Sequence, residues 1–206
     1  ACDMFIGSTL QIDLQGNSST ATRDRIAGFG GAPNMGSDAR GRRHASPAWL
    51  KAGQQAALPG QMPRGRKLVV QMVETFREHM APAFVDRLDA WELAERANMP
   101  LPPVMIYGDD VTHILTEEGI ANLLLCRTPE EREQAIRGVA GYTAVGMARD
   151  KAMVENLRDR GVIRRAEDLG VRSRDASRDL LAARSVKDLV HWSGGLYDPP
   201  KRFRNW

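Results

Sequence analysis

The sequence Gly28-Phe29-Gly30-Gly31-Ala32-Pro33-Asn34-Met35-Gly36-Ser37-Asp38-Ala39-Arg40-Gly41 is the stretch around which this chain is organised. It holds five glycines in fourteen residues, and glycine at that density destabilises the interior of a helix or a strand. Such a segment suits a place where the main chain turns tightly or approaches a ligand. The consecutive N–H groups of Gly30, Gly31 and Ala32 suit an anionic oxygen, either a carboxylate or a developing oxyanion. We therefore predict that these three residues are the catalytic oxyanion donors.

Basic residues surround this loop. The segment between Arg25 and Val73 carries eight Lys or Arg residues and one acidic residue, although the whole chain has a net charge of only +3. Guanidinium groups match the geometry of carboxylates and pyrophosphates. We therefore expect some of Arg40, Arg42, Arg43 and His44 to bind substrate or a carrier arm. The phosphates of a nucleic-acid backbone would also attract these residues. Composition alone does not distinguish a carboxylate, a pyrophosphate and a nucleic acid as the ligand.

Other polar residues near the loop are weaker candidates. Asn34 and Ser37 are expected to position groups within the loop, and Asn17 either donates its amide to the substrate or holds the turn at residues 15–17. The acidic run at residues 117–118 is read as an ordinary turn between strands, so no nucleophile is assigned. The four histidines have no metal-ligand spacing, so no metal site is expected.

Length and composition point to an ordinary globular α/β protein. The chain has 206 residues, of which 42% are hydrophobic and 27% charged. Its longest apolar run, residues 120–126, is too short to span a membrane. The two cysteines, Cys2 and Cys126, are far apart and indicate reduced thiols in the cytoplasm. The start of the chain lacks both an initiator Met and a signal pattern, so we expect it to be one piece of a longer polypeptide.

Periodicity and capping signals predict the main elements. Strands are expected at residues 5–7, 10–14, 67–73, 104–107, 111–115 and 120–125. Helices are expected at residues 81–97, 128–137 and 151–160, with a shorter one at 185–192. The second helix has the clearest start, because Thr128, Pro129 and Glu131 form a capping-box pattern. Two domains are expected, an α/β domain at residues 1–145 and a helical region with an extended tail at 146–206.

Several stretches of the chain resemble a known family. The run Phe5-Ile6-Gly7-Ser8-Thr9-Leu10-Gln11-Ile12-Asp13-Leu14-Gln15-Gly16-Asn17, followed by Gly30-Gly31-Ala32, resembles the second half of coenzyme A transferases. The extension at residues 36–44 and the tail at residues 192–200 are similar to the alpha subunits of bacterial malonate decarboxylases. The resemblance covers essentially all of this chain but only the C-terminal part of the family's longer subunit.

This resemblance implies a fold, a reaction and a set of partners. The fold implied is a coenzyme A transferase-like α/β domain with a mostly parallel mixed sheet flanked by helices, followed by a short helical region and tail. The active site would lie where two related halves meet, so the missing N-terminal half is an expected partner. The reaction implied is exchange of acetate for malonate on a thioester of an acyl carrier protein, without a covalent enzyme intermediate. The chain itself would bind no cofactor, because the dephospho-coenzyme A-type arm belongs to the carrier subunit. The decarboxylase subunits complete the expected complex, with neither nucleic acid nor membrane as a partner.

Three other interpretations stay open at this point. A transferase or hydrolase acting on free acyl-coenzyme A would use the same loop chemistry. A basic nucleic-acid-binding module would use residues 40–44 and 64–67, although the loop has few aromatic residues for stacking. A third possibility is that this chain assembles with its missing half and does no chemistry alone.

Overall fold

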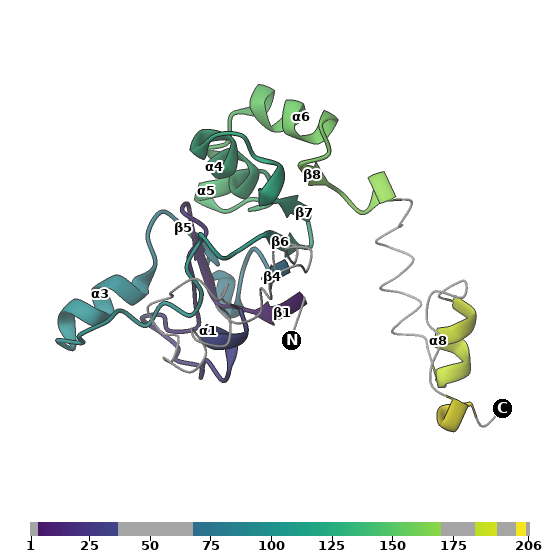
Figure 1. The fold of residues 1–206 in the computed structure, drawn as a ribbon, viewed down its shortest axis with the longest axis horizontal. Coiled ribbons are helices and arrows are strands. Elements are labelled where there is room, and N and C mark those ends of the chain that lie inside the picture. Colours follow the sequence, from purple (N-terminus) through teal and green to yellow (C-terminus); the bar gives the residue numbers. More distant parts are fainter. Residues whose placement is uncertain (1–3, 37–67, 170–183, 193–200, 205–206) are drawn as a thin grey trace, which may run out of the picture. The chain divides into compact units, whose positions relative to one another are not determined.

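A five-stranded mixed sheet organises the first part of the chain. The structure, a computed structural model, describes residues 4–36, 68–169, 184–192 and 201–204 (Figure 1). The strand order is β1-β4-β6-β7-β8, with β1, β4 and β6 parallel to one another and β7 and β8 each antiparallel to the preceding strand. The strands are β1 (Met4–Ser8), β4 (Leu68–Met72), β6 (His113–Thr116), β7 (Gly119–Asn122) and β8 (Ile163–Arg164). This sheet and the helices beside it confirm the expected α/β class.

A smaller three-stranded sheet follows directly from β1. It has the order β3-β2-β5, with β2 (Gln11–Asp13) antiparallel to β3 (Ser18–Ser19) and parallel to β5 (Phe84–Val85). The turn between β2 and β3 passes through Gly16, whose φ of +81° lies in the left-handed region that favours glycine. The run at residues 5–14 therefore divides into two strands that belong to different sheets.

Helices α4 (Pro129–Gly138), α5 (Ala144–Met147) and α6 (Lys151–Asp159) lie in sequence between strands β7 and β8 of the main sheet. The predicted N-terminus of α4 is confirmed, because the Thr128 hydroxyl accepts a hydrogen bond from the Glu131 N–H at 3.2 Å. Residues of α4, α6, β6 and β7 meet in one buried core, which includes Ile114, Ala121, Ile136 and Leu157. Two short 3-10 helices, η1 (Glu78–Met80) and η2 (Leu123–Leu125), complete this part.

The helix expected at residues 81–97 is wrong in its first half. Only α3 (Asp89–Arg96) is helical, whereas Phe84 and Val85 form β5. The Ala83 carbonyl accepts the Ile12 N–H at 2.8 Å, and the Ala83 N–H donates to the Thr75 carbonyl at 2.9 Å. These long-range bonds take the place of the bonds that a helical turn would need. The strand expected at residues 104–107 is also reduced, to an isolated bridge between Ile106 and Ser18.

The chain divides into two compact units after Arg164. The second unit contains η3 (Glu167–Leu169), α8 (Val186–Trp192) and η4 (Lys201–Phe203). The domain boundary expected between residues 145 and 146 falls inside α5.

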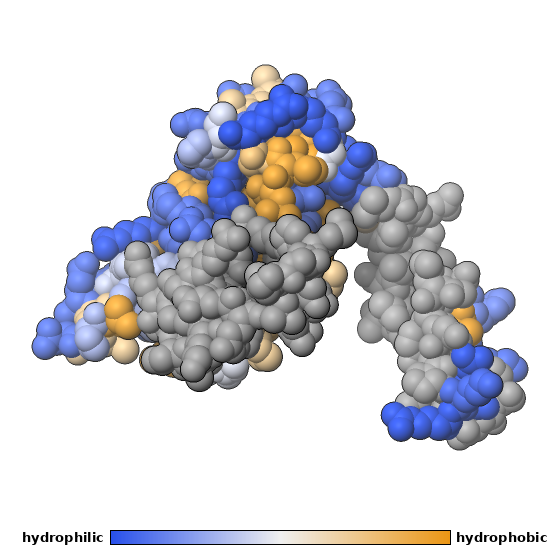
Figure 2. Space-filling model, viewed as in Figure 1, coloured by the Kyte–Doolittle hydropathy of each residue, from blue (hydrophilic) through white to orange (hydrophobic). Residues whose placement is uncertain are grey.

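The surface of the first unit is polar over α6 and carries an apolar patch beside β7 (Figure 2). In the described part of the chain, no helix combines the length and the apolar character needed to cross a membrane.

Candidate functional site

A cavity of about 980 Å³ lies at the carboxyl ends of the three parallel strands. Ligands of open α/β sheets commonly bind at this edge, because strand ends and the following loops converge there. The ends of β1, β4 and β6 supply much of the lining: Ser8, Thr9, Leu10, Met72, Val73, Glu74, Thr116 and Glu117. The sheet therefore places the cavity where its topology favours a ligand.

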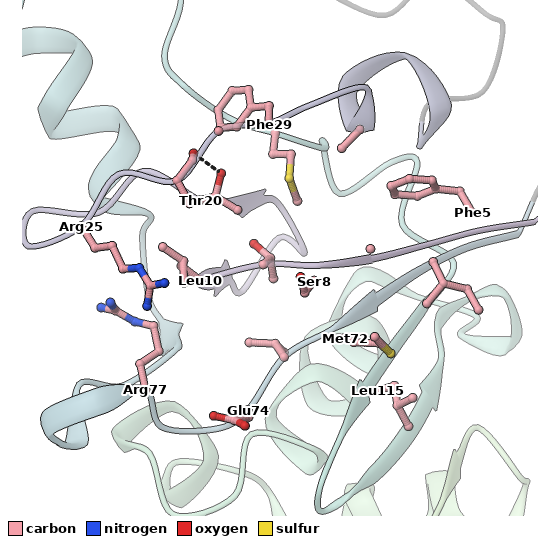
Figure 3. Close-up of a pocket in the computed structure, with 18 of the residues that line it drawn as sticks. Phe5, Ser8, Leu10, Thr20, Arg25, Phe29, Met72, Glu74, Arg77 and Leu115 are labelled. Atoms are coloured by element: carbon pink, nitrogen blue, oxygen red, sulfur yellow. Dashed lines mark hydrogen bonds between the residues drawn. The ribbon is translucent and has the colours of Figure 1, made fainter. Parts of the chain in front are cut away.

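The glycine-rich loop forms one wall of this cavity. Gly28, Phe29, Gly31 and Ala32 line it, together with Met35 of the four-residue helix α1 (Ala32–Met35). The loop is held from β3 onward by a reciprocal pair of hydrogen bonds. The Thr20 hydroxyl donates to the Ala27 carbonyl at 2.9 Å, and the Ala27 N–H donates to the Thr20 carbonyl at 2.8 Å (Figure 3).

The three predicted oxyanion donors differ in their hydrogen bonding. The Ala32 N–H donates to the Phe29 carbonyl at 3.1 Å, so this amide closes a turn. Among the described residues, no acceptor is found for the N–H groups of Gly30 and Gly31. Gly31 lines the cavity, and Gly30 turns the chain with a φ of +55°. Of the three amides, that of Gly31 therefore combines a place in the lining with an uncommitted N–H.

Two arginines that the sequence did not single out reach the other end of the cavity. Figure 3 shows the guanidinium groups of Arg25 and Arg77 approaching each other, and Glu74 lines the same cavity. Arg77 is only 11% exposed and pairs with Asp24 at 3.2 Å, and this arginine, with the Thr22 hydroxyl, lowers the pKa of Asp24. The Nε of Arg77 is buried and has no hydrogen-bond partner among the described residues.

The neighbouring sequence does not mark Arg77 as a site residue, because Arg77 lies outside the basic segment around the loop. A tight hairpin brings it to the cavity: its N–H donates to the Ala81 carbonyl at 2.8 Å, and Phe76 bridges Pro82. Arg25 lies inside that segment, but its nearest acidic partner among the described residues, Glu78, is 3.9 Å away and 80% exposed. Arg25 therefore keeps a largely uncommitted guanidinium at the cavity.

Glu117 lies at the cavity rim in the turn between β6 and β7. Its carboxylate accepts hydrogen bonds from the Thr75 N–H at 3.0 and 3.1 Å and a further short one from the Thr75 hydroxyl. Thr75 is almost fully buried, so the carboxylate ties the chain after β4 to the end of β6. The bonds give this acidic turn a role in holding two strand ends together.

Asn17 lies in the β2–β3 turn and is not part of the cavity lining. Its side-chain Nδ2 donates to Asp13 at 3.0 Å, and its Oδ1 accepts the Gly108 N–H at 2.9 Å. Burial raises the pKa of Asp13, while the hydrogen bonds from Asn17 and the Gln15 N–H oppose that shift. Both ends of the Asn17 amide are therefore engaged within the protein.

The remaining candidates are only partly located. Asn34 lies in helix α1. The other candidates lie outside the described residues: Ser37, Arg40, Arg42, Arg43 and His44. Within the described ranges, no group of three or more His, Cys, Asp or Glu side chains is arranged to hold a metal ion.

Comparisons with known proteins point in one direction. A family model described as "Malonate decarboxylase, alpha subunit, transporter" matches residues 1–206. An acetyl-S-ACP:malonate ACP transferase of Malonomonas rubra is 64% identical over the whole of this chain, which spans 38% of that relative's length. The crystal structure of a Pseudomonas malonate decarboxylase hetero-tetramer in complex with malonate contains a chain that is 59% identical to the present one, with a TM-score of 0.73. The present chain covers 37% of that longer chain.

A second solved structure agrees with the first. The malonate decarboxylase alpha subunit of Acinetobacter baumannii is 56% identical over 97% of this chain, which again covers 37% of the longer protein, with a TM-score of 0.74. The chain thus spans well under half the length of each of these relatives, although the matches cover nearly all of the chain itself. On these grounds the chain belongs to the family of malonate decarboxylase alpha subunits.

Proposed function

We propose that this chain is part of a transferase that exchanges acetate for malonate on the thioester of an acyl carrier protein. The observation that carries the proposal is its 64% identity, over its whole length, to a relative named for that reaction. The cavity supports it, since a loop with uncommitted amides borders the carboxyl edge of the sheet. The proposal concerns a longer subunit, because the chain spans 38% of that relative.

The proposed reaction needs a nucleophile, an oxyanion site and a leaving group. A malonate carboxylate oxygen bonds to the acetyl carbonyl carbon, and the C–S bond breaks to release the carrier thiolate. That thiolate then bonds to the malonyl carbonyl carbon of the mixed anhydride, and acetate leaves. Each attack places negative charge on a carbonyl oxygen, and a preset N–H donor there can lower the barrier by roughly 3–4 kcal/mol.

The Gly31 amide is the leading donor in this proposal, because it lines the cavity and has no acceptor among the described residues. Gly30 supplies the turn that presents it, and Ala32 closes that turn through Phe29. We place Asn17 as a support of the β2–β3 turn, on the strength of its bonds to Asp13 and the Gly108 N–H.

The substrate groups proposed for the loop extension are cationic. Arg40, Arg42, Arg43 and His44 would neutralise malonate or the phosphates of the carrier arm, with Asn34 and Ser37 positioning the loop. The arm itself, a dephospho-coenzyme A-type group on the carrier subunit, is treated as a substrate. The proposed partners are the carrier subunit, the decarboxylase subunits and the N-terminal part of the same subunit, in the cytoplasm.

The test is an assay of the full-length subunit with an acetyl-loaded carrier subunit, measuring malonate-dependent release of acetate. Free acetyl-coenzyme A serves as the competing donor. Transfer from the carrier that greatly exceeds transfer from free acetyl-coenzyme A supports the proposal, and the reverse preference would contradict it.

A variant at Gly31 tests the amide. A Cβ at Gly31 comes 2.8 Å from the terminal carbon of Met35, a flexible end that can move. The Gly31→Val change should therefore keep the fold and crowd the donor, lowering transfer. The Met35→Ala variant is the control, and the double variant Gly31→Val/Met35→Ala removes the packing conflict while keeping the crowding. If the double variant regains full activity, the amide assignment is wrong.

A further inference from the structure

A short hairpin after β3 carries Arg25 to the cavity. The reciprocal hydrogen bonds between Thr20 and Ala27 close the base of this hairpin, and the next pair inward, Ala21 and Ile26, forms an antiparallel bridge. The side chain of Arg25 leaves the hairpin near its tip, lines the cavity and is half exposed. The hairpin is therefore a fixed base for this side chain.

The tip of the hairpin is held by Thr22, Asp24 and Arg77. The Thr22 hydroxyl donates to the Asp24 carboxylate at 2.8 Å and accepts the Arg25 N–H at 3.2 Å. The Thr22 N–H donates to the Arg25 carbonyl at 2.8 Å, and Thr22 is only 1% exposed. From the segment after β4, Arg77 binds Asp24 at 3.2 Å. Asp24 and Arg77 are thus positioning residues for the backbone of Arg25.

The guanidinium of Arg25 has only a weak partner in the part of the chain that the structure describes. The Glu78 carboxylate is 3.9 Å away and 80% exposed, so water screens the pair and the contact contributes little. The Arg77 guanidinium approaches that of Arg25 (Figure 3), and two like charges at short range favour an anion beside them. Because Arg77 already pairs with Asp24, the N–H donors that are left for a ligand at this end of the cavity are those of Arg25.

We infer that Arg25 binds the carboxylate of malonate that does not react, an inference that rests on the proposed transfer reaction. In that reaction one carboxylate of malonate attacks the thioester, and the other keeps its charge. A guanidinium presents two parallel N–H donors that match the two oxygens of a carboxylate. Gly31 and Arg25 line the same cavity. A dicarboxylate bound there therefore meets the Gly31 amide at its reacting end and Arg25 at its other end.

The charges of the lining favour a single carboxylate over the pyrophosphate of the carrier arm. Among the described lining residues, three carboxylates, those of Glu74, Glu78 and Glu117, accompany the two guanidiniums of Arg25 and Arg77. A pyrophosphate carries more negative charge than Arg25 alone offsets, and the neighbouring carboxylates repel the excess. A carboxylate needs one guanidinium and adds one negative charge.

This contact makes Arg25 a specificity-determining residue. Acetate, the product of the exchange, has one carboxylate and leaves Arg25 without a partner when its carboxylate lies at the reacting end. A site built to bind a polar group discriminates against an analogue that lacks the group, because the site's own donors are then unpaired. Arg25 therefore favours binding of malonate over rebinding of acetate.

Steady-state kinetics of the full-length subunit with an acetyl-loaded carrier subunit test this role. Arg25→Gln should raise KM for malonate about 10–100-fold, the loss expected for one charge-assisted contact, while KM for acetate stays within about twofold. KM for acetate is measured by exchange of isotopically labelled acetate into the acetyl carrier. Arg23→Gln is the matched control and should change neither KM, because Arg23 lies in the same hairpin, pairs with Glu92 and does not line the cavity.

Two kinetic results would overturn the inference. An equal rise in both KM values would assign Arg25 to the reacting carboxylate, which malonate and acetate share. A rise in KM for the acetyl carrier, with KM for malonate unchanged, would assign Arg25 to the phosphates of the carrier arm. Arg25→Lys keeps the charge without the paired donors and should fall between wild type and Arg25→Gln; a KM for malonate equal to that of Arg25→Gln would contradict a contact based on charge.

Asp24 is tested as a positioning residue by the same comparison. Asp24→Ala releases Thr22 and Arg77 from the hairpin tip, so KM for malonate should rise by less than in Arg25→Gln while KM for acetate stays unchanged. Asp24→Asn keeps an oxygen acceptor for both partners and should recover much of the loss. An unchanged KM for malonate in Asp24→Ala would show that Arg25 does not depend on this support.

Direct binding separates the inference from the proposed function. Calorimetry of the full-length subunit without the carrier should show malonate binding at least about tenfold more tightly than acetate, and Arg25→Gln should abolish that preference. A preference that is absent in wild type or unchanged in Arg25→Gln would overturn the inference. A wild-type subunit that prefers malonate through Arg25 but transfers no acetyl group would contradict the proposed function and leave the malonate contact standing.

Discussion

Replacing Gly30 with alanine tests whether the loop needs its left-handed turn. Gly30 has a φ of +55°, and a Cβ built there meets no atom within 4 Å, so the change adds backbone strain without a clash. An L-residue in this region costs about 1–2 kcal/mol. Since 1–2 kcal/mol changes an equilibrium by a factor of about 5–30, the population of the native loop conformation should fall by that factor in the variant. The presentation of the Gly31 amide would weaken accordingly.

The assay is malonate-dependent acetate release by the full-length subunit, followed together with the Tm. Relaxation confined to the loop should lower the rate by about 5–30-fold with little change in Tm. Strain retained in the folded state should instead lower the Tm by about 2–8 °C. Gly28→Ala is the matched control, because Gly28 lies in the same loop, also meets no atom within 4 Å and has no left-handed φ. Gly30→Asn should recover much of the loss, because Asn tolerates the left-handed region. Equal rates and Tm values for Gly30→Ala and Gly28→Ala would refute the reasoning.

Three further predictions concern the frame of the site. Asn17→Ala removes hydrogen bonds to Asp13 and to the Gly108 N–H. The free energy of unfolding measured in urea should therefore fall by about 1.5–3 kcal/mol, while KM for malonate stays unchanged. A raised KM at unchanged stability would argue for substrate contact. Gly108→Ala should prevent stable folding, as judged by circular dichroism, because its Cβ would lie 2.0 Å from the backbone carbonyl oxygen of Gln15 in the β2–β3 turn; a native spectrum and Tm would contradict this. Arg160 and a backbone N–H lower the pKa of Glu131 from 4.5 to about 2, so its stabilising contribution is present above pH 4.5 and disappears as the pH falls toward 2. The stability difference between wild type and Glu131→Gln in urea unfolding should therefore shrink from pH 6 to pH 3, and a constant difference would disprove the coupling.

Local signals predicted those elements whose cause lies within a few residues. The start of α4 follows from Thr128 and Glu131, whose hydrogen bonds close the first turn. The turn at Gly16 follows from glycine's access to a left-handed φ. Strand β4 was expected at residues 67–73 and is found at Leu68–Met72. In each case the decisive interaction is local, so neighbouring sequence is sufficient to predict it.

Periodicity failed where a distant strand competed with the local pattern. The apolar residues at 84, 85 and 88 recur at helical spacing, yet Phe84 is buried in a strand that pairs with β2. Spacing alone cannot distinguish a helix from a short buried strand, because both bury apolar side chains. The partner strand, about seventy residues earlier, decided the outcome.

The sequence by itself determined the glycine-rich loop, the capped helices and the family resemblance, because turn chemistry, capping and motif spacing are written in neighbouring residues. Only the tertiary structure decided that Arg77 and Glu117 lie at the same cavity as Gly31. It also decided that Gln71 and Ile114 are buried on one face of the main sheet, whereas their neighbours Met72 and Leu115 are partly exposed on the other. These juxtapositions depend on strand order and register, which join residues far apart in the chain. A one-residue change of register would exchange the two faces, and no local pattern records that choice.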